Sequence, residues 1–335
     1  MTTAINRERL AATFTELCEI SSPSRREGAI SAHLKRIFAE LGADTIYEDG
    51  SAAQTGSESG NLIIRFGGNM PDREGLFLSC HMDTVGPADG VKVLRTGDIF
   101  TSRGDTILGG DDKAGIAAVL ELLTLLRENK APHPTIEVVI TTCEEIGLLG
   151  AKNLDYQKLQ TSYGYALDST GNNDVIIGAP AANKFTIEIK GMAAHAGLCP
   201  EAGINALAIA AQALTALRIG RLDEESTCNF GRIQGGVATN IVPERVILQG
   251  EVRSHSDKKL ARYTEEIFKA FEKAAADWKG NPATGDHRPA VTIEIVDDYP
   301  LLAIAPDAPV LQRIQKAAQA CGKDLRHLVA GGGSD

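Results

Sequence analysis

Two adjacent glutamates, Glu144 and Glu145, follow a strand-like run at positions 136–140 in which every residue except the second is apolar. Like charges repel each other, and burial makes it harder to keep both ionised. A solvated loop is the ordinary explanation for such a pair. A metal site is the alternative, because a cation would neutralise one carboxylate and leave the other free to carry a proton.

Three more motifs place an imidazole or carboxylates where strands end or a helix begins: His81 and Asp83 in "HMD", Asp111 in "GGDDKAG", and Asp168 in "ALDST". Each motif alone is typical of a structural His–Asp pair, a helix cap or a solvated acid. Brought together, the carboxylates would repel strongly without a cation. Imidazole with carboxylates favours zinc, manganese or cobalt over calcium. The number of groups predicts two divalent metal ions, about 3.5–4 Å apart and bridged by one carboxylate.

The elements that must position these groups alternate between strand and helix. This order indicates an α/β sheet covered on both faces, and such sheets bind ligands at the carboxyl ends of their strands. Helices are expected at 6–19, 27–41 and 113–129, strands at 61–66, 75–85, 135–145 and 164–170, and a hairpin within 86–110.

After residue 180 the pattern changes. "NKFTIEIKG" alternates with period two, as in a half-exposed antiparallel strand. The following order of strand, helix, two strands, helix and strand predicts a split βαβ sandwich. The expected domains are therefore a metal-binding catalytic domain at 1–180 and 300–335, interrupted by a smaller α+β domain at 181–299.

The bulk composition argues against several classes of protein. The chain has 335 residues and a formal net charge of −10, which disfavours nucleic acid or an anionic membrane as its partner. No apolar run approaches the roughly 20 residues that span a membrane. The first residues lack the apolar core of a secretory signal, and the six cysteines are scattered. We therefore expect a cytoplasmic protein with reduced cysteines.

The motifs "HMD", "GGDDKAG", "CEEIGLLGA" and "ALDST", in this order, resemble the two-metal exopeptidase family that includes peptidase T, carboxypeptidase G2, aminoacylase-1 and succinyl-diaminopimelate desuccinylase. "GMAAHAG" and "EVRSH" most resemble peptidase T-like members. The resemblance implies an α/β fold: a phosphorylase/hydrolase-like three-layer catalytic domain with an inserted α+β (ferredoxin-like) domain that serves as lid and dimerisation domain. It also implies a homodimer formed through that domain.

The resemblance further implies a role for each motif residue. In the metal site, His81 and Asp168 would bind one ion, Asp111 would bridge both ions, and Glu145 would bind the second. Glu144 would be the general base, Asp83 would orient His81, and the peptide bond after Asp111 would be cis. Three residues of the inserted domain would contact substrate: His195, Asn240 and Arg253.

The implied activity is that of an aminopeptidase acting on short peptides. A carboxypeptidase or an N-acyl-amino-acid amidohydrolase on the same scaffold is the alternative. From another class, the chain could be a non-catalytic binding protein of the same fold. A nucleotide-binding reading of "LGGDDKAG" fails because the GxxxxGK[ST] spacing is missing.

One departure from the family pattern concerns the second metal. Its terminal histidine ligand is expected shortly after a "GGSD" segment, and this chain ends at that segment, at Asp335. None of the other histidines fits the motif. The expectation is therefore a shortened catalytic domain, an impaired second site with weak or no activity, and two zinc ions (or manganese or cobalt) in an intact site.

Overall fold

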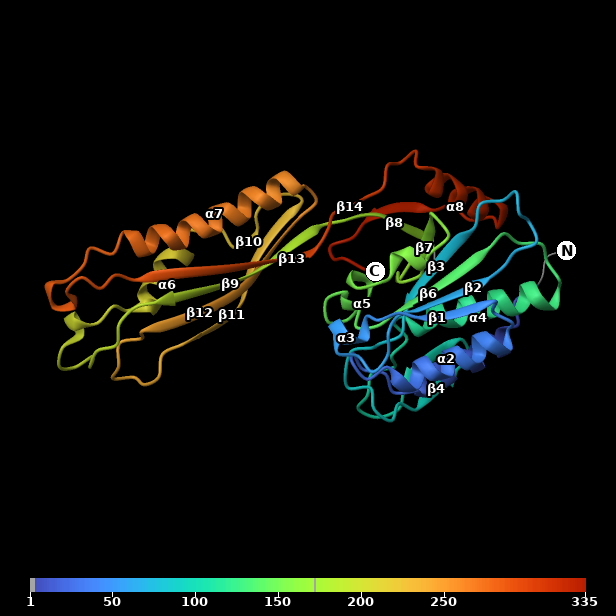
Figure 1. The fold of residues 1–335 in the computed structure, drawn as a ribbon, viewed down its shortest axis with the longest axis horizontal. Helices are drawn as coiled ribbons and strands as arrows, with labels where there is room; N and C mark the ends of the chain where they lie inside the picture. Colours follow the sequence, from blue (N-terminus) through green and yellow to red (C-terminus); the bar gives the residue numbers. More distant parts are fainter. Residues whose placement is uncertain (1–3, 172) are drawn as a thin grey trace. The chain divides into compact units, whose positions relative to one another are not determined.

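The computed structural model describes residues 4–171 and 173–335, which form two compact units (Figure 1). The first lies within Met1–Asn172, Pro309–Lys323 and Ser334–Asp335. The second lies within Asn173–Ala308 and Asp324–Gly333. None of the helices in the described residues is both long and apolar enough to cross a membrane.

A five-stranded sheet in the order β1-β2-β6-β3-β7 organises the first unit. β6 and β7 both run parallel to β3, whereas β1 and β2 are antiparallel to their neighbours. All six residues of β6 are buried, as a central strand covered on both faces requires. The strands are β1 (Thr45–Glu48), β2 (Leu62–Phe66), β3 (Leu76–His81), β6 (Ile136–Thr141) and β7 (Gly164–Ala166).

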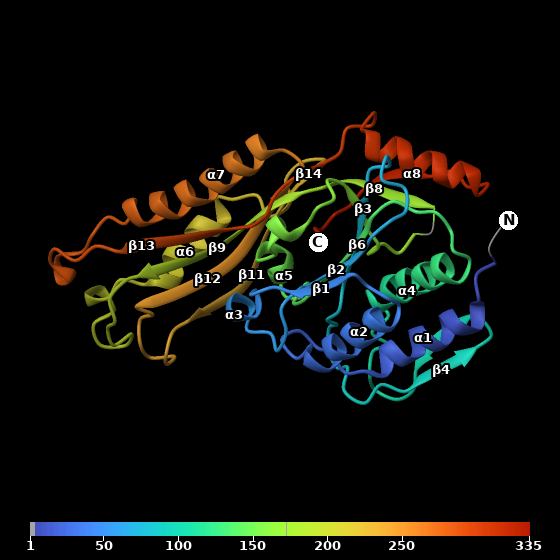
Figure 2. The same cartoon turned by 45° about the vertical axis from the view of Figure 1, so that its right-hand side comes forward.

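Helices cover both faces of this sheet. Figures 1 and 2 show α1 (Arg7–Glu19), α2 (Gly28–Glu40) and α4 (Lys113–Glu128) on one face and α8 (Pro309–Ala320) on the other. The main core lies between the sheet and the first three helices, where α4 contributes five buried apolar side chains, Ile116, Ala117, Val119, Leu120 and Leu123. Two small elements, α3 (Ala52–Thr55) and α5 (Leu149–Lys152), and the hairpin of β4 (Val93–Thr96) and β5 (Ile99–Ser102) complete this part.

The second unit is an α+β sandwich. Its sheet has the order β10-β11-β12-β9-β13, and α6 (Ala206–Thr215) and α7 (Asp257–Ala276) pack on one face. Buried and less buried residues alternate along β9 from Lys184 to Lys190, as the sequence predicts. The strands are β9 (Ala181–Lys190), β10 (Gly220–Arg221), β11 (Ser226–Gly235), β12 (Arg245–Ser254) and β13 (Ala290–Tyr299).

A small three-stranded sheet joins this unit. Its order is β14-β8-β15, with β8 (Asp174–Ala179) between β14 (Leu302–Ala303) and the parallel β15 (Arg326–Val329). The sequence expectation assigns these strands to the catalytic domain. They cluster with the second unit because β8 continues almost directly into β9. The predicted helices and longer strands are confirmed within a few residues, and the fold class is confirmed as α/β with an inserted α+β unit.

Candidate active site

Parallel strands bring the chemical motifs to one edge of the first sheet. His81 is the last residue of β3, Glu144 follows the end of β6 by three residues, and Asp168 follows β7 by two. Because β6, β3 and β7 are parallel neighbours, their carboxyl ends meet at this edge. Asp111 reaches the same place from the segment that starts α4, where Asp112 is the N-cap and accepts the N–H of Gly115.

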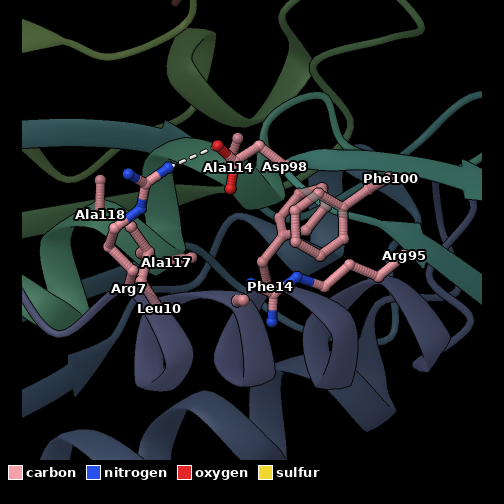
Figure 3. Close-up of a pocket in the computed structure, with 10 residues that line it drawn as sticks. Arg7, Leu10, Phe14, Arg95, Asp98, Phe100, Ala114, Ala117 and Ala118 are labelled. Atoms are coloured by element: carbon pink, nitrogen blue, oxygen red, sulfur yellow. Dashed lines mark hydrogen bonds and ion pairs between the residues drawn. The ribbon is translucent and has the colours of Figure 1, made fainter.

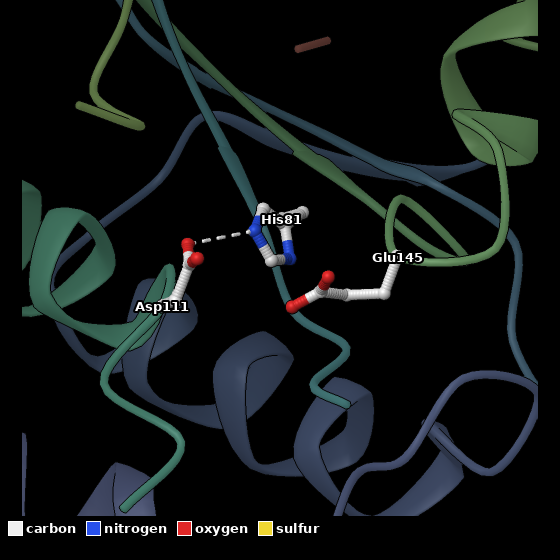
Figure 4. Close-up of side chains that lie close together, drawn as sticks. All are labelled: His81, Asp111 and Glu145. Atoms are coloured by element: carbon white, nitrogen blue, oxygen red, sulfur yellow. Dashed lines mark hydrogen bonds and ion pairs between the residues drawn. The ribbon is translucent and has the colours of Figure 1, made fainter. Parts of the chain in front are cut away.

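Donor atoms converge into two overlapping groups. His81, Asp111 and Glu145 each offer an atom within 4.8 Å of the others, and so do Asp111, Asp112 and Asp168. Figure 4 shows the first group, with the side chains of Asp111 and Glu145 approaching the imidazole from different elements. Asp111 belongs to both groups, as a bridging ligand must. Within the described residues, these groups contain one histidine and leave Glu144 out.

Burial sets the electrostatics of this edge. It raises the pKa of Glu144 to about 8 and that of Asp112 to about 7, and it raises the pKa of Glu145 as well. Nearby carboxylates add to the rise at Glu144 and Glu145. Asp111 differs from these groups, because its hydrogen bond with His81 holds the pKa of that carboxyl below its usual range.

The donor set fits divalent cations. One imidazole with several carboxylates is the chemistry that zinc, manganese and cobalt prefer. One carboxylate oxygen, Asp112 Oδ2, is buried without a hydrogen-bond partner, although Asp112 is only 3% exposed. Such an oxygen is costly to bury unless a positive charge lies near it. The pKa values of neighbouring carboxyls are raised for the same reason, because burial makes their negative charge costly.

Asp83 is fully buried, and it contacts more than the imidazole. Nδ1 of His81 lies 3.0 Å from the backbone carbonyl oxygen of Asp83 and 3.5 Å from its carboxylate. The carboxylate accepts the backbone N–H of Glu144 at 2.9 Å and that of Glu145 at 3.3 Å. It also accepts the hydroxyl of Ser24 at 2.6 Å. Asp83 thus contacts His81 mainly through its backbone, and its side chain holds the glutamate pair.

The peptide bond between Asp111 and Asp112 is cis, as the resemblance implies. Next to it, Lys113 is 1% exposed, and its ammonium donates to the carbonyl oxygen of Ile20 at 2.8 Å. Burial lowers the pKa of Lys113 to about 8. This contact fixes the start of α4 against the end of α1.

Sequence reasoning missed several residues at this edge. Ser334 donates to Asp168 at 2.6 Å, and Thr141 donates to the carboxylate of Asp335. Burial raises the pKa of Asp335 to about 6. The sequence offered one usable signal, the "GGGSD" segment itself, but it did not indicate where that segment folds.

The three substrate-contact candidates lie in the second unit. His195 and Asn240 are exposed neighbours, because Ala196 N donates to the carbonyl oxygen of Asn240 at 2.8 Å. Arg253 is partly buried near the far end of β12, where it binds Glu251 and the carbonyl oxygen of Gly331. Asn240 lies before the start of β12 at Arg245, whereas Arg253 lies near the end of that strand. The extended strand from Arg245 to Arg253 is roughly 25 Å long, so the two places are far apart.

A separate cavity of about 340 Å³ lies in the first unit between α1, α4 and the β4–β5 hairpin (Figure 3). Alanine and aromatic side chains form most of its wall, including Phe14 and Phe100 in an edge-to-face pair with ring centroids 5.1 Å apart. Its charged groups are already paired, Arg7 with Asp98 and Arg95 with Glu8. None of the described residues that line this cavity belongs to the two donor groups, so we place the candidate active site at the strand ends.

Comparisons with known proteins match the chain to peptidases. Residues 177–279 match the peptidase dimerisation domain, and residues 61–199 match peptidase family M28. The chain is 41% identical to the Bacillus subtilis protein YqjE over 332 residues, covering 99% of this chain and 86% of YqjE. It is 30% identical to Escherichia coli peptidase T over 202 residues, half of this chain and 49% of that protein. Carboxypeptidase G2 of Pseudomonas is 31% identical over 214 residues, 59% of this chain and 50% of that protein.

Several solved structures match over nearly the whole chain, and two of them are peptidases with TM-scores near 0.9. They are the aminopeptidase PepT from Bacillus cereus, with a TM-score of 0.89, and a tripeptidase from Staphylococcus aureus, with a TM-score of 0.90. Each is 37% identical, and each match covers 98% of this chain and 86% of the other. The chain therefore belongs to the dinuclear-metal exopeptidase family of peptidase T and carboxypeptidase G2, and the resemblance stated from its motifs is confirmed.

Proposed function

We propose that this chain is a metal-dependent aminopeptidase that removes the N-terminal residue of short peptides, tripeptides in particular. The observation that carries the proposal is that the two glutamates lie differently relative to the metal-donor residues. Glu145 gathers with His81 and Asp111 as a donor group, whereas Glu144 stays outside that group. Without metal, burial raises the pKa of Glu144 to about 8, and cations held by its neighbours would lower that pKa and leave the carboxylate ionised to accept a proton.

Different residues of the site would perform different parts of the peptidase reaction. When bound, divalent cations supply an acidified water and neutralise negative charge on the reacting carbonyl. His81, Asp111, Asp168 and Glu145 would hold them. Glu144 then accepts the proton of the attacking water at a carboxylate oxygen and passes it to the nitrogen of the leaving amine.

Zinc is the metal we propose, with manganese and cobalt as alternatives that suit the same donors. The resemblance assigns Glu145 to a second ion, apart from the ion of His81 and Asp168, whereas in the structure Glu145 shares a donor group with His81, and Asp168 groups with Asp111 and Asp112. We still propose a second ion that is bound more weakly than the first. In support, the donor groups within the described residues contain a single imidazole. A cytoplasmic location fits the cysteines, all six of which are unpaired in the structure.

The substrate contacts form the next part of the proposal. The guanidinium of Arg253 suits a peptide carboxylate. His195 would help bind the reacting carbonyl, and Asn240 would be another group that contacts substrate. The two places are far apart on the second unit, which supports a homodimer in which His195 serves the site of the partner subunit. The match to the peptidase dimerisation domain supports a homodimer.

The test is a panel of peptides assayed with zinc, manganese or cobalt. Free tripeptides should be cleaved after their first residue, and the same peptides with an acetylated N-terminus should resist cleavage. Tripeptides amidated at the C-terminus should be cleaved with a higher KM, because they lack the carboxylate for Arg253. Preferential cleavage of the acetylated peptides would instead favour the carboxypeptidase or amidohydrolase alternative, which the partial match to carboxypeptidase G2 keeps in view.

A further inference from the structure

Four consecutive backbone N–H groups, those of residues 142–145, donate to side chains instead of joining a strand ladder. Together these residues form the turn that leads from β6 to the glutamate pair. The acceptors are Asn61 for Thr142 at 3.1 Å, Glu27 for Cys143 at 3.1 Å, and Asp83 for Glu144 and Glu145 at 2.9 and 3.3 Å.

The middle of this turn has an unusual backbone. Cys143 has φ of +55°, in the left-handed region that residues with a Cβ rarely adopt. Its N–H and its thiol both approach the same oxygen, Oε1 of Glu27, at 3.1 and 3.3 Å. Glu27 therefore binds the one residue of the turn whose conformation most needs support.

Glu27 contacts Cys143 instead of capping the helix that it precedes. It is the N-cap residue of α2, yet its side chain does not cap that helix. The carboxylate is fully buried and accepts the N–H of Arg25 at 2.9 Å and the hydroxyl of Ser57. A buried carboxylate must be hydrogen-bonded throughout, and here one of its donors belongs to the residue directly before Glu144.

We propose that Glu27 is a positioning residue for the peptidase reaction. By holding the left-handed peptide of Cys143, it sets the direction in which Glu144 and Glu145 leave the chain. Within the described part of the chain, Glu27 is hydrogen-bonded to Arg25, Ser57 and Cys143 and to none of the donor groups, so it would act through the turn. The inference rests on the proposed function, since it assigns a catalytic task to the turn that Glu27 supports.

The test compares two substitutions of similar size. Glu27→Gln retains a carbonyl oxygen for the Cys143 N–H, and its amide can donate to Ser57. Glu27→Met retains neither. Because a displacement of about 1 Å in a reacting group can lower the rate about 100-fold, we expect Glu27→Met to lower kcat by about 10- to 100-fold with KM within about threefold. Glu27→Gln should stay within about fivefold of wild type.

Two control variants separate positioning from stability. Glu58→Gln alters an exposed glutamate that also contacts the start of α2, through the N–H of Gly28, and should leave kcat unchanged. Ser57→Ala removes the hydroxyl donor from the Glu27 carboxylate but leaves the Cys143 contact. It should therefore keep kcat within about threefold even if its melting temperature falls.

Amide hydrogen exchange gives a readout that does not need activity. The peptide covering residues 141–149 should exchange faster in Glu27→Met and as slowly as wild type in Glu27→Gln. Unchanged exchange or unchanged kcat in folded Glu27→Met would overturn the proposal, and so would an equal loss of kcat in Ser57→Ala. A wild-type protein that cleaves no peptide would overturn the proposed function instead, and the exchange comparison would still decide whether Glu27 holds the turn.

Discussion

Nε2 of His81 lies 3.2 Å from Oδ1 of Asp111, although 30 residues separate them in the chain. Burial by itself lowers the pKa of His81, but the hydrogen bonds to Asp111 and Asp83 raise it to about 12. At neutral pH without metal, an imidazolium therefore supplies the positive charge that the carboxylates need. A cation that binds the imidazole must displace that proton.

Metal binding should consequently release protons. Titration of metal-free protein with zinc at pH 7, by calorimetry in buffers of different ionisation enthalpy, should show at least about one proton released for the first ion bound. His195→Asn, which changes a histidine outside the donor groups, should release the same number. Binding of zinc without proton release would contradict the assignment of His81 as a ligand.

Substitution of the two glutamates should have different effects on activity and on metal content. Glu144→Gln should lower kcat by about 10²- to 10⁴-fold, as loss of a general base does, while the metal content measured by mass spectrometry stays at the wild-type value. Glu145→Gln should lose bound metal and, as a consequence, activity. Full activity of Glu144→Gln, or loss of metal from it, would show that the roles are assigned wrongly.

The metal-free protein should lose stability as the pH rises from about 4 to 8. Burial raises the pKa of Glu144 to about 8, of Asp112 to about 7 and of Asp335 to about 6, each above its unfolded value. In this window the folded state binds more protons than the unfolded state, so its free energy of unfolding falls with pH. His81, raised above its unfolded value of 6.5, acts in the same direction at neutral pH and above.

Thermal melting with and without zinc at pH 5 and pH 8 measures this effect. The metal-free protein should melt at a lower temperature at pH 8, and zinc should raise the melting temperature more at pH 8 than at pH 5. Equal stabilisation by zinc at both values would argue against a cation among these carboxyls.

Gly150→Ala should destabilise the first unit by about 1–3 kcal/mol or more, because an added Cβ overpacks this site. The new atom would lie 2.2 Å from the carbonyl oxygen of Thr142 and 2.6 Å from Oδ1 of Asn61, both part of the glutamate turn. Gly50→Ala, with no atom within 4 Å of the added Cβ, should change stability by less than about 0.5 kcal/mol. Urea denaturation of both variants makes the comparison, and similar midpoints would contradict it.

A mixing experiment tests the proposed dimer. His195→Ala and Glu144→Gln should each be nearly inactive as separate proteins. If His195 serves the partner subunit, unfolding and refolding an equal mixture should restore about a quarter of wild-type activity, since half of the dimers then contain one intact site of two. No recovery in dimers shown to have exchanged subunits would mean that His195 acts within its own chain or not at all.

The sequence predicted the strand-end residues because their position follows from topology. His81, Asp168 and the glutamate pair come directly after apolar runs, and parallel strands place such residues at one edge. The contacts that hold them could not be predicted in this way. The pattern around Asp83 suggests a partner for His81, and only the fold shows that its carboxylate faces two backbone N–H groups.

The short strands were harder to predict for a related reason. β1 has four residues and β15 has four, with no fully buried residue in either, so neither carries a clear periodic pattern. Their pairing depends on which longer strand has a free edge, and this is a property of the assembled sheet. Glu27 was missed for the same reason, because nothing near it in the sequence indicates that its partner is Cys143.

The side-chain acceptors of the glutamate turn also affect how this region folds. Asn61, Glu27 and Asp83 lie 81, 116 and 61 residues from the groups that they bind. Closing such long loops is entropically costly, and contacts between distant segments slow folding. A fragment containing only β6 and the two glutamates would lack every one of these acceptors. The catalytic pair therefore acquires its arrangement only after three distant segments have docked, and a partly folded chain would not present a working carboxylate pair.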